Sequence, residues 1–416
     1  MTTGSGRSFS RRRFVAGALG TGTAIGAGAT LGGCAAPATA PAEAVPRFVP
    51  FDGAAQPGIT ALPVPARGLM AAFSVQAPDR ARLGTLFADL TDESRALMAG
   101  RPPTVRDPAF PPVDSGVLGD QPPPDNLSVV VSVGASLFDD RFGLADRRPT
   151  ELVTMPFLAN DRLDPNRSHG DLLLTLEAGH TDTLQFTLRQ LMRRTRSNMV
   201  LKWMVEGYGR GAATANAGGT PRNLLGFKDG TANLDATDDA LLDRHVWVAP
   251  SDGEPGWAVG GSYQAVRIIR MFVEFWDRTQ LAEQEALIGR HKLSGAPLGM
   301  RDEFDDPQLA DDPDGARIAL TSHIRLANPR TPETADNLML RRGFSYTRGF
   351  DNAGRLDQGL AFVSYQRSLE RSFLAVQQRL SGEGLEEYIL PEGGGFFFAL
   401  PGAPGPDRFL GDGMVG

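Results

Sequence analysis

Apolar and polar residues along the chain follow two alternating patterns. Short apolar runs, typical of strands, are each followed by a stretch with Leu or Phe every three or four residues, which is typical of one helix face. The patterns predict these strand–helix pairs: Gly68–Gln76 with Asp79–Met98, Asp171–Glu177 with Asp182–Arg193, Ala265–Phe275 with Gln280–His291, and Gly359–Tyr365 with Ser368–Leu380. Leu127–Val133 is predicted as a further strand.

This order of elements predicts βαβ-type units in each half of the chain, and therefore an α+β fold of two domains. The glycine- and proline-rich segment 218–222 marks the expected boundary, with one domain over residues 51–217 and another over residues 218–416. The halves look like a weak duplication, because Leu174–His180 and Ala361–Arg367 each precede a helical pattern. With 416 residues, the chain is long enough to bury a substantial core.

The first 33 residues are set apart as an export signal. Ser10–Val15 reads Ser-Arg-Arg-Arg-Phe-Val, which matches the twin-arginine pattern, and a run rich in Gly and Ala follows as far as Gly33. Because glycine destabilises a helix interior, a membrane-spanning helix is the weaker interpretation of this run. The twin-arginine translocase exports folded proteins, commonly with a cofactor in place, so we expect an exported protein that holds a cofactor.

Cys34 is the only cysteine of the chain. A single cysteine excludes an intrachain disulfide, a thiolate-held iron–sulfur cluster and a cysteine zinc knuckle. Leu31–Cys34 resembles a lipoprotein cleavage box, in which Cys34 would be lipidated; the alternative is cleavage at the small residues Ala42–Ala44. Residues 34–50, rich in Ala and Pro, are a tether under either alternative. The expected location is extracellular, periplasmic or on the cell envelope, with membrane attachment only through Cys34.

The charge balance disfavours one class of partner. The formal net charge is −7, although residues 1–33 hold four arginines and no acidic residue. The rest of the chain is therefore more acidic still, and a nucleic-acid-binding surface is not expected.

Three short segments carry candidate chemistry. Gly226–Asn233 is a loop in which glycines bracket Asp229, as expected where backbone approaches a ligand and holds out a carboxylate. His323 has no His or Cys at metal-chelating spacing, which suits a single axial bond to haem iron and not a zinc site. Arg341 and Arg342 directly follow an apolar run. Read one at a time, these segments also fit a common turn, a structural histidine and a pair of surface cations.

Together and in this order, the three segments resemble the dye-decolourising (DyP-type) haem peroxidase family. Gly359–Gln366 and the near-terminal Gly393–Phe398 agree with the same family, so the resemblance covers residues 50–405. With the export signal, the chain is most similar to the secreted subgroup that includes the haem-handling component of ferrous-iron uptake systems, the deferrochelatases.

The resemblance implies two ferredoxin-like domains with antiparallel sheets and haem b in the C-terminal domain. The haem is expected to be non-covalent, because the chain has no Cys-x-x-Cys-His motif. The resemblance makes Asp229 the distal acid–base residue, His323 the proximal iron ligand and Arg341 the distal arginine, with Arg342 as the alternative register. Gly343 stands where some members have asparagine. Further cofactor contacts are expected at Gly226, Phe227, Gly230, Thr231, Arg325, Arg330, Ser345 and Phe362.

The function implied by the resemblance is reduction of hydrogen peroxide through a ferryl intermediate, with oxidation of dyes, phenols or other electron donors. The expected partners are hydrogen peroxide, an organic or haem-derived donor and the twin-arginine translocase; iron-uptake proteins and a homodimer remain open. One alternative is an iron-uptake component that releases iron from haem. A non-catalytic haem-binding lipoprotein is a second, which the Asp229 and Arg341 pair disfavours. The Gly-x-x-Asp-Gly loop speaks against a third, a chlorite dismutase relative.

Overall fold

The structure is a computed structural model that describes residues 47–104, 106–209 and 219–416. The expected twin-arginine signal, Cys34 and most of the tether lie outside the described residues. Among the helices within these ranges, none combines the length and the apolar character needed to cross a membrane.

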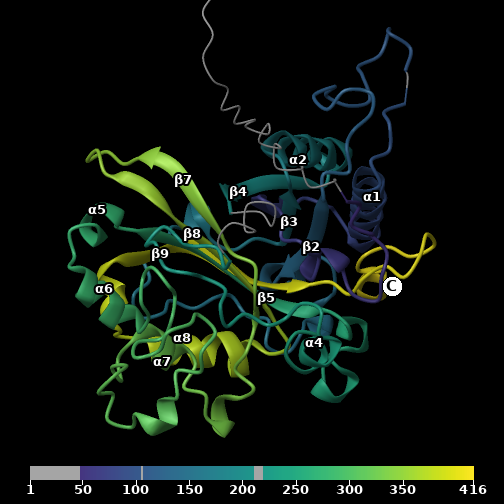
Figure 1. Cartoon of the computed structure of the whole chain (residues 1–416). Helices are drawn as coiled ribbons and strands as arrows, with labels where there is room; N and C mark the ends of the chain where they lie inside the picture. Colours follow the sequence, from purple (N-terminus) through teal and green to yellow (C-terminus); the bar gives the residue numbers. More distant parts are fainter. Residues whose placement is uncertain (1–46, 105, 210–218) are drawn as a thin grey trace, which may run out of the picture. The chain divides into compact units, whose positions relative to one another are not determined.

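The first half of the chain builds an antiparallel sheet with two helices packed on it (Figure 1). Its strands stand in the order β4-β1-β3-β2. Asp79 begins the first helix, because its carboxylate accepts a hydrogen bond of 2.8 Å from the Arg82 N–H. The elements are β1 (Arg67–Val75), α1 (Arg80–Met98), β2 (Ser128–Gly134), β3 (Leu172–Ala178), α2 (Thr181–Thr195) and β4 (Met199–Tyr208).

The second half repeats the strand order as β9-β5-β8-β7, again antiparallel. The short strand β6 pairs with the end of β8 that β7 leaves free. The strands are β5 (Ser262–Met271), β6 (Leu340–Arg341), β7 (Phe344–Phe350), β8 (Leu356–Gln366) and β9 (Ile389–Ala399). The helices are α4 (Asp239–His245), α5 (Val273–Trp276), α6 (Leu281–Ile288), α7 (His323–Ala327), α8 (Ala375–Leu380) and α9 (Asp412–Val415).

Strands of the two halves join into one closed, barrel-like sheet. β4 pairs with β7, β2 pairs with β9, and the pairing of β5 with β8 completes the ring. At the first junction a Cβ on Gly207 would lie 2.0 Å from the Ser345 carbonyl oxygen, so only glycine permits this close pairing. Closure removes the exposed edges that an open sheet of these strands would have.

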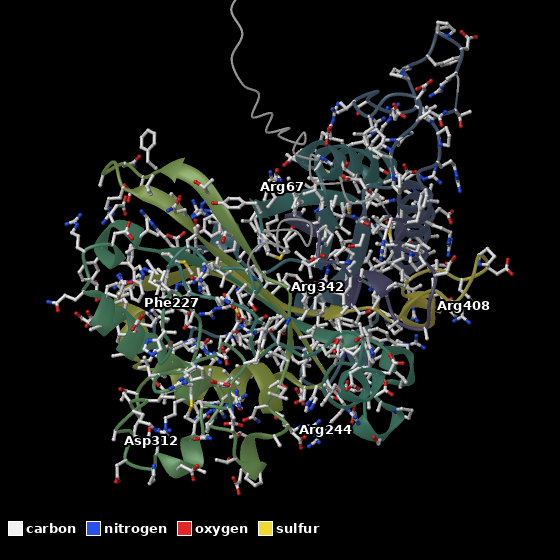
Figure 2. All side chains as sticks on the ribbon, viewed as in Figure 1. Arg67, Phe227, Arg244, Asp312, Arg342 and Arg408 are labelled. Carbon is white, nitrogen blue, oxygen red and sulfur yellow. The ribbon has the colours of Figure 1, made fainter. Side chains whose placement is uncertain are left out.

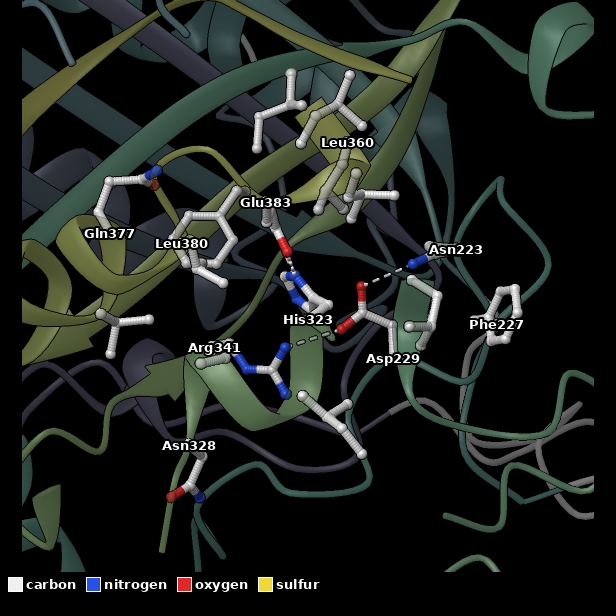
Figure 3. Close-up of a pocket in the computed structure, with 18 of the residues that line it drawn as sticks. Asn223, Phe227, Asp229, His323, Asn328, Arg341, Leu360, Gln377, Leu380 and Glu383 are labelled. Atoms are coloured by element: carbon white, nitrogen blue, oxygen red, sulfur yellow. Dashed lines mark hydrogen bonds and ion pairs between the residues drawn. The ribbon is translucent and has the colours of Figure 1, made fainter. Parts of the chain in front are cut away.

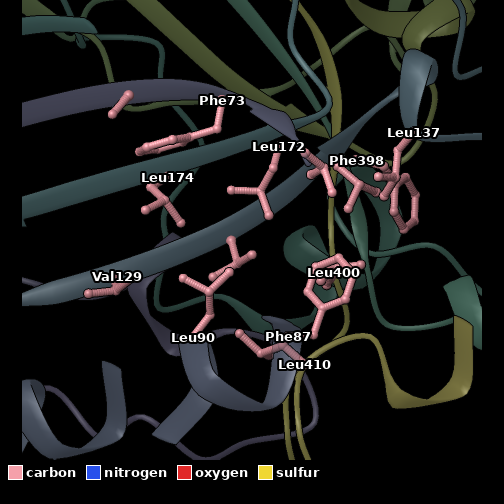
Figure 4. Close-up of a cluster of buried hydrophobic side chains, with 14 of the residues drawn as sticks. Phe73, Phe87, Leu90, Val129, Leu137, Leu172, Leu174, Phe398, Leu400 and Leu410 are labelled. Carbon is pink, nitrogen blue, oxygen red and sulfur yellow. The ribbon is translucent and has the colours of Figure 1, made fainter. Parts of the chain in front are cut away.

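A large apolar core lies between the sheet of the first half and its helices (Figure 4). Leu172 and Leu174 of β3 point to the same face because side chains alternate along a strand. Phe87 and Leu90 of α1 meet them there, and Phe398 of β9 extends the cluster into the second half. These residues are buried, so the core holds strands from both halves together.

The same alternation gives the second half a face that is free to line a cavity. Ile268 of β5 and Ala361 of β8 belong to a buried apolar cluster on one face of the sheet. Their neighbours Ile269 and Leu360 point to the other face, and both line the cavity that lies beside α6, α7 and α8. The alternation of side chains along β5 and β8 therefore determines which face of the sheet lines the cavity.

The antiparallel α+β fold expected from the sequence is confirmed, and the strand–helix pairs are found close to their expected bounds. One expected strand is too long. The apolar run Ala265–Phe275 leaves the sheet after Met271, because the chain turns at Phe272 and the next four residues form α5. The expected helix Ser368–Leu380 begins with a π-helical turn, Leu369–Leu374, before α8. The division into domains at residues 217 and 218 stays a prediction.

Candidate active site

A cavity of about 310 Å³ lies between β5 and β8 on one side and α6, α7 and α8 on the other. A mostly apolar cavity with a few convergent polar groups is typical of a cofactor or small-molecule site. In the described part of the chain, no group of three or more His, Cys, Asp or Glu residues is arranged to hold a bare metal ion. The apolar lining includes Leu225, Phe227, Ile269, Met271, Ile288, Leu360, Phe362, Phe373, Leu380 and Leu385.

His323 begins α7 and lines this cavity (Figure 3). Its Nδ1 lies 2.8 Å from Oε2 of Glu383, whose side chain is only 4% exposed. Because a carboxylate only accepts hydrogen bonds, Nδ1 carries the proton and Nε2 is left to present a lone pair. Burial alone would lower the pKa of His323, but the Glu383 carboxylate outweighs burial and raises it. The result is a basic imidazole held in one orientation.

Asp229 and Arg341 form an ion pair at the same cavity (Figure 3). The Arg341 Nη1 lies 2.9 Å from Oδ1 of Asp229. The other carboxylate oxygen, Oδ2, has only a long contact of 3.4 Å from the Asn223 amide. The pair therefore leaves Oδ2 the freer oxygen for exchanging a proton with a bound substrate.

Asn233 ties the loop that carries Asp229 to the strand that carries Arg341. Its side-chain oxygen accepts from the Arg341 N–H at 2.8 Å, and its amide donates to the Arg341 carbonyl at 2.9 Å. One side chain thus occupies both main-chain polar groups of Arg341. This double contact fixes the separation between the carboxylate and the guanidinium.

The Asp229 loop has the backbone that its glycines suggest. Gly226 and Gly230 have φ of +86° and +136°, a region that side chains rarely tolerate. Glu303, 9% exposed, anchors the loop through an ion pair with Lys228 and a 2.8 Å hydrogen bond from Thr231. Burial would raise the pKa of Glu303, but its hydrogen-bonded partners outweigh burial and lower it. The anchor is therefore a stable carboxylate.

Arg342 is only 6% exposed and lies among the crowded side chains near the centre of the view in Figure 2. It forms a buried ion pair with Glu177 of β3 and donates to the Ala61 carbonyl at 3.0 Å. Arg341, the last residue of β6, lines the cavity, whereas Arg342 directly after it does not.

We expect Arg342→Met to destabilise the protein by about 3 kcal/mol, because Glu177 would remain buried without its partner. The measurement is urea unfolding of the cofactor-free protein. Arg341→Met is the matched control, since the Arg341 side chain is 33% exposed and the loss of stability should be small. An unchanged unfolding midpoint for Arg342→Met would contradict the structural role given to this ion pair.

Of the other residues expected to contact the cofactor, three lie outside the cavity lining and five belong to it. Gly226 serves the turn but does not line the cavity. Arg325 is committed elsewhere, because its guanidinium donates to the Asp312 carboxylate at 3.1 Å and to the Asp312 carbonyl at 2.6 Å. Ser345 lies on β7, paired with β4 and β8, and also stays outside the lining. The expected contacts that do line the cavity are Phe227, Gly230, Thr231, Arg330 and Phe362.

Comparison with known proteins decides the family. Residues 56–209 match the N-terminal domain, and residues 220–404 the C-terminal domain, of the family described as Dyp-type peroxidase. The chain belongs to the Dyp-type peroxidase family. Deferrochelatase of Escherichia coli K12 is 48% identical over 402 residues, which cover 94% of this chain and 95% of the relative. Two DyP-type relatives of known structure are similar throughout.

Ferric DtpA from Streptomyces lividans has a TM-score of 0.80 and 34% identity, covering 89% of this chain and 98% of its own. The DyP-type peroxidase from Cellulomonas bogoriensis has a TM-score of 0.79 and 33% identity, covering 89% of this chain and 99% of its own. This Dyp-type peroxidase is therefore a haem enzyme that reduces hydrogen peroxide at the expense of an electron donor.

The cavity of this Dyp-type peroxidase fits a haem. His323 offers one ring nitrogen, which suffices because a porphyrin supplies the other four ligands of the iron. Apolar side chains from β5 and β8 form a wall suited to the porphyrin face. Asp229 and Arg341 add one charged pair to this otherwise mostly apolar cavity.

Glu383 is the site residue that the sequence did not identify. It lies 60 residues after His323, in a turn between α8 and β9, and no local spacing connects the two. A carboxylate that holds a metal-ligating histidine fixes the ring and increases its basicity.

For this reason we expect Glu383→Gln to reduce haem affinity or peroxidase activity about 10- to 100-fold. The variant should also have a higher iron reduction potential, measured by spectroelectrochemistry of the haem-loaded protein. Glu285→Gln is the control, because Glu285 pairs with His291 at 3.1 Å outside the cavity lining. Equal behaviour of the two variants would contradict the role of Glu383.

Proposed function

We propose that this haem peroxidase binds non-covalent haem b with His323 as the iron ligand and uses Asp229 and Arg341 to activate hydrogen peroxide. The observation that carries the proposal is that the His323–Glu383 and Asp229–Arg341 pairs line one cavity. A protein that only stored haem would have no need of the second pair.

In the proposed mechanism, Asp229 moves one proton between the two oxygens of hydrogen peroxide. As an ion pair with Arg341 it is present as the carboxylate, the form that a general base requires. Oδ2 takes the proton from one oxygen and then delivers it to the other, which leaves as water. The Arg341 guanidinium stabilises the negative charge that develops on the leaving oxygen.

The bound haem would supply the iron that binds the peroxide and the electrons that break its O–O bond. Glu383 holds the Nδ1 proton of His323 and so leaves Nε2 as the nitrogen that would bind the haem iron. Asn233 and Glu303 keep the acid–base loop in place while the proton moves. Dyes, phenols or other organic donors then return the electrons.

A second candidate function is release of iron from haem, favoured by 48% identity to proteins named deferrochelatase. Both functions use the same cavity, but they differ in product. The test incubates the haem-loaded protein with peroxide and a phenolic dye, and follows dye bleaching together with the fluorescence of metal-free porphyrin. Sustained bleaching with the haem retained supports the peroxidase, whereas stoichiometric appearance of intact porphyrin supports iron release.

We also propose that each half is a ferredoxin-like domain, residues 51–217 and 218–416, with the haem in the second. The shared strand order, β4-β1-β3-β2 and β9-β5-β8-β7, supports this, as does the strand–helix–strand–strand–helix–strand sequence of the first half.

Export is proposed from the sequence alone. The twin-arginine pattern at Ser10–Val15 supports transport of the folded, haem-loaded protein, and Leu31–Cys34 supports a lipid anchor at Cys34. The translocase and an iron-uptake system are the proposed protein partners, and a homodimer is the proposed assembly.

A further inference from the structure

Arg290 is a buried arginine that lines the cavity, and its charge has no carboxylate partner among the described residues. It follows α6 and is 7% exposed. Its Nη1 donates to the main-chain carbonyls of Gly295 at 2.6 Å and Glu303 at 2.9 Å. Both acceptors are neutral, so they orient the guanidinium without neutralising it.

Every other cation of the lining has a carboxylate partner. The pairs are Arg267 with Asp161, Lys228 with Glu303, Arg341 with Asp229, His323 with Glu383 and Arg330 with Asp306. An isolated buried charge is unfavourable unless a counter-charge reaches it. The cavity therefore has one position where an anionic group of a ligand would be stabilised.

The charges around Arg290 increase the stabilisation that an anionic group of a ligand would provide. Burial lowers the pKa of Arg290, and the nearby positive charge of Arg330 lowers it further; the Glu303 carboxylate, already paired with Lys228, raises it by less. Asp306, the partner of Arg330, is 66% exposed, so its charge is well screened by solvent. The two arginines thus form a cationic corner of the cavity.

The geometry of the guanidinium also indicates the kind of anion. An arginine has five N–H donors, and the two on Nη1 are used by the carbonyls. Among the described residues, both hydrogen bonds of the Arg290 guanidinium come from Nη1, and Nε and Nη2 donate none. This remaining edge presents parallel donors, which match the two oxygens of a carboxylate.

We propose that Arg290 binds a propionate carboxylate of the haem through its Nε and Nη2 edge. The proposal rests on the proposed binding of haem b, whose only anionic substituents are its two propionates. Arg325, which the sequence suggested as a cofactor contact, is instead paired with Asp312.

The test compares haem with its dimethyl ester, which keeps the iron porphyrin but lacks the carboxylate charges. Each is titrated into cofactor-free wild type, Arg290→Met and Arg290→Lys, and binding is followed by the Soret absorbance. We expect Arg290→Met to weaken haem binding about 10- to 100-fold, as for loss of a hydrogen-bonded charge pair. The same substitution should leave binding of the ester unchanged, and Arg290→Lys should lie in between for haem.

Arg379→Met is the matched control. Arg379 also donates to main-chain carbonyls, those of Leu326 and Ala327, but it does not line the cavity. The Arg379→Met variant should bind haem and its dimethyl ester as wild type does. Far-ultraviolet circular dichroism of the cofactor-free variants shows whether each one folds.

Equal weakening of haem and ester binding by Arg290→Met would overturn the proposal, since Arg290 would then support the fold alone. If Arg290→Met leaves haem affinity unchanged but abolishes binding of inorganic phosphate to the cofactor-free protein, the corner holds a free anion and the propionate assignment is wrong. If wild type binds neither porphyrin, the proposed function itself fails, an outcome distinct from both.

Discussion

Asp229→Asn should slow the reaction with hydrogen peroxide about 10²- to 10⁴-fold, the usual contribution of general acid–base catalysis. The amide keeps the size of the side chain and can still accept a hydrogen bond from Arg341, but it cannot take a proton from peroxide. The haem should stay bound, because Asp229 is not its ligand. The measurement is stopped-flow absorbance of the ferric Soret band after mixing with peroxide.

Asp235→Asn is the control for this experiment. Asp235 lies six residues after Asp229, and its carboxylate accepts a hydrogen bond of 2.7 Å from the Thr237 hydroxyl. Because Asp235 does not line the cavity, its variant should react as wild type does. If Asp229→Asn also reacts within about twofold of wild type, far below the range for acid–base catalysis, the proton-transfer role given to Asp229 is wrong.

The sequence predicted the strands of this fold better than their assembly. The apolar runs Ala265–Phe275 and Gly359–Tyr365 each identified a strand, although the first run extends past the end of β5 at Met271. Closure of the sheet depends on the pairing of Gly207 with Tyr346 and of Val133 with Phe398. Nothing in the pattern of either strand specifies a partner so distant in the chain.

The candidate site was predictable where several residues lie close together in the sequence. Asp229 stands in a glycine-bracketed loop, and the doublet Arg341–Arg342 needed only the knowledge of which side chain faces the cavity. Arg325 was expected at the cofactor, and α7 was not predicted. Residues two apart in a helix point about 200° away from each other, so a helix that turns His323 to the cavity turns Arg325 away.

Glu383 and Arg290 show what sequence patterns omit. Each acts through a contact formed only in the folded chain, Glu383 with His323 and Arg290 with two carbonyls of the next loop. A single glutamate or arginine outside a motif has the same appearance as a solvated surface charge. Burial distinguishes them, and burial follows from the complete fold.

His323→Ala should weaken haem binding about 100-fold or more, since loss of a residue that only supports a metal ligand already costs about 10- to 100-fold. Haem that remains bound should lose the spectrum of an iron with axial imidazole. The measurement is haem titration of the cofactor-free variant, followed by addition of free imidazole. Because the substitution leaves space beside Glu383, added imidazole should bind there and restore the spectrum.

His291→Ala provides the matched control for the loss of a histidine–glutamate pair. His291 contacts Glu285 at 3.1 Å, yet it is 43% exposed and does not line the cavity. Its variant should bind haem as wild type does, with or without imidazole. If His323→Ala keeps the wild-type spectrum and affinity, another residue must hold the iron, and the arrangement of both pairs around the haem would have to be assigned anew.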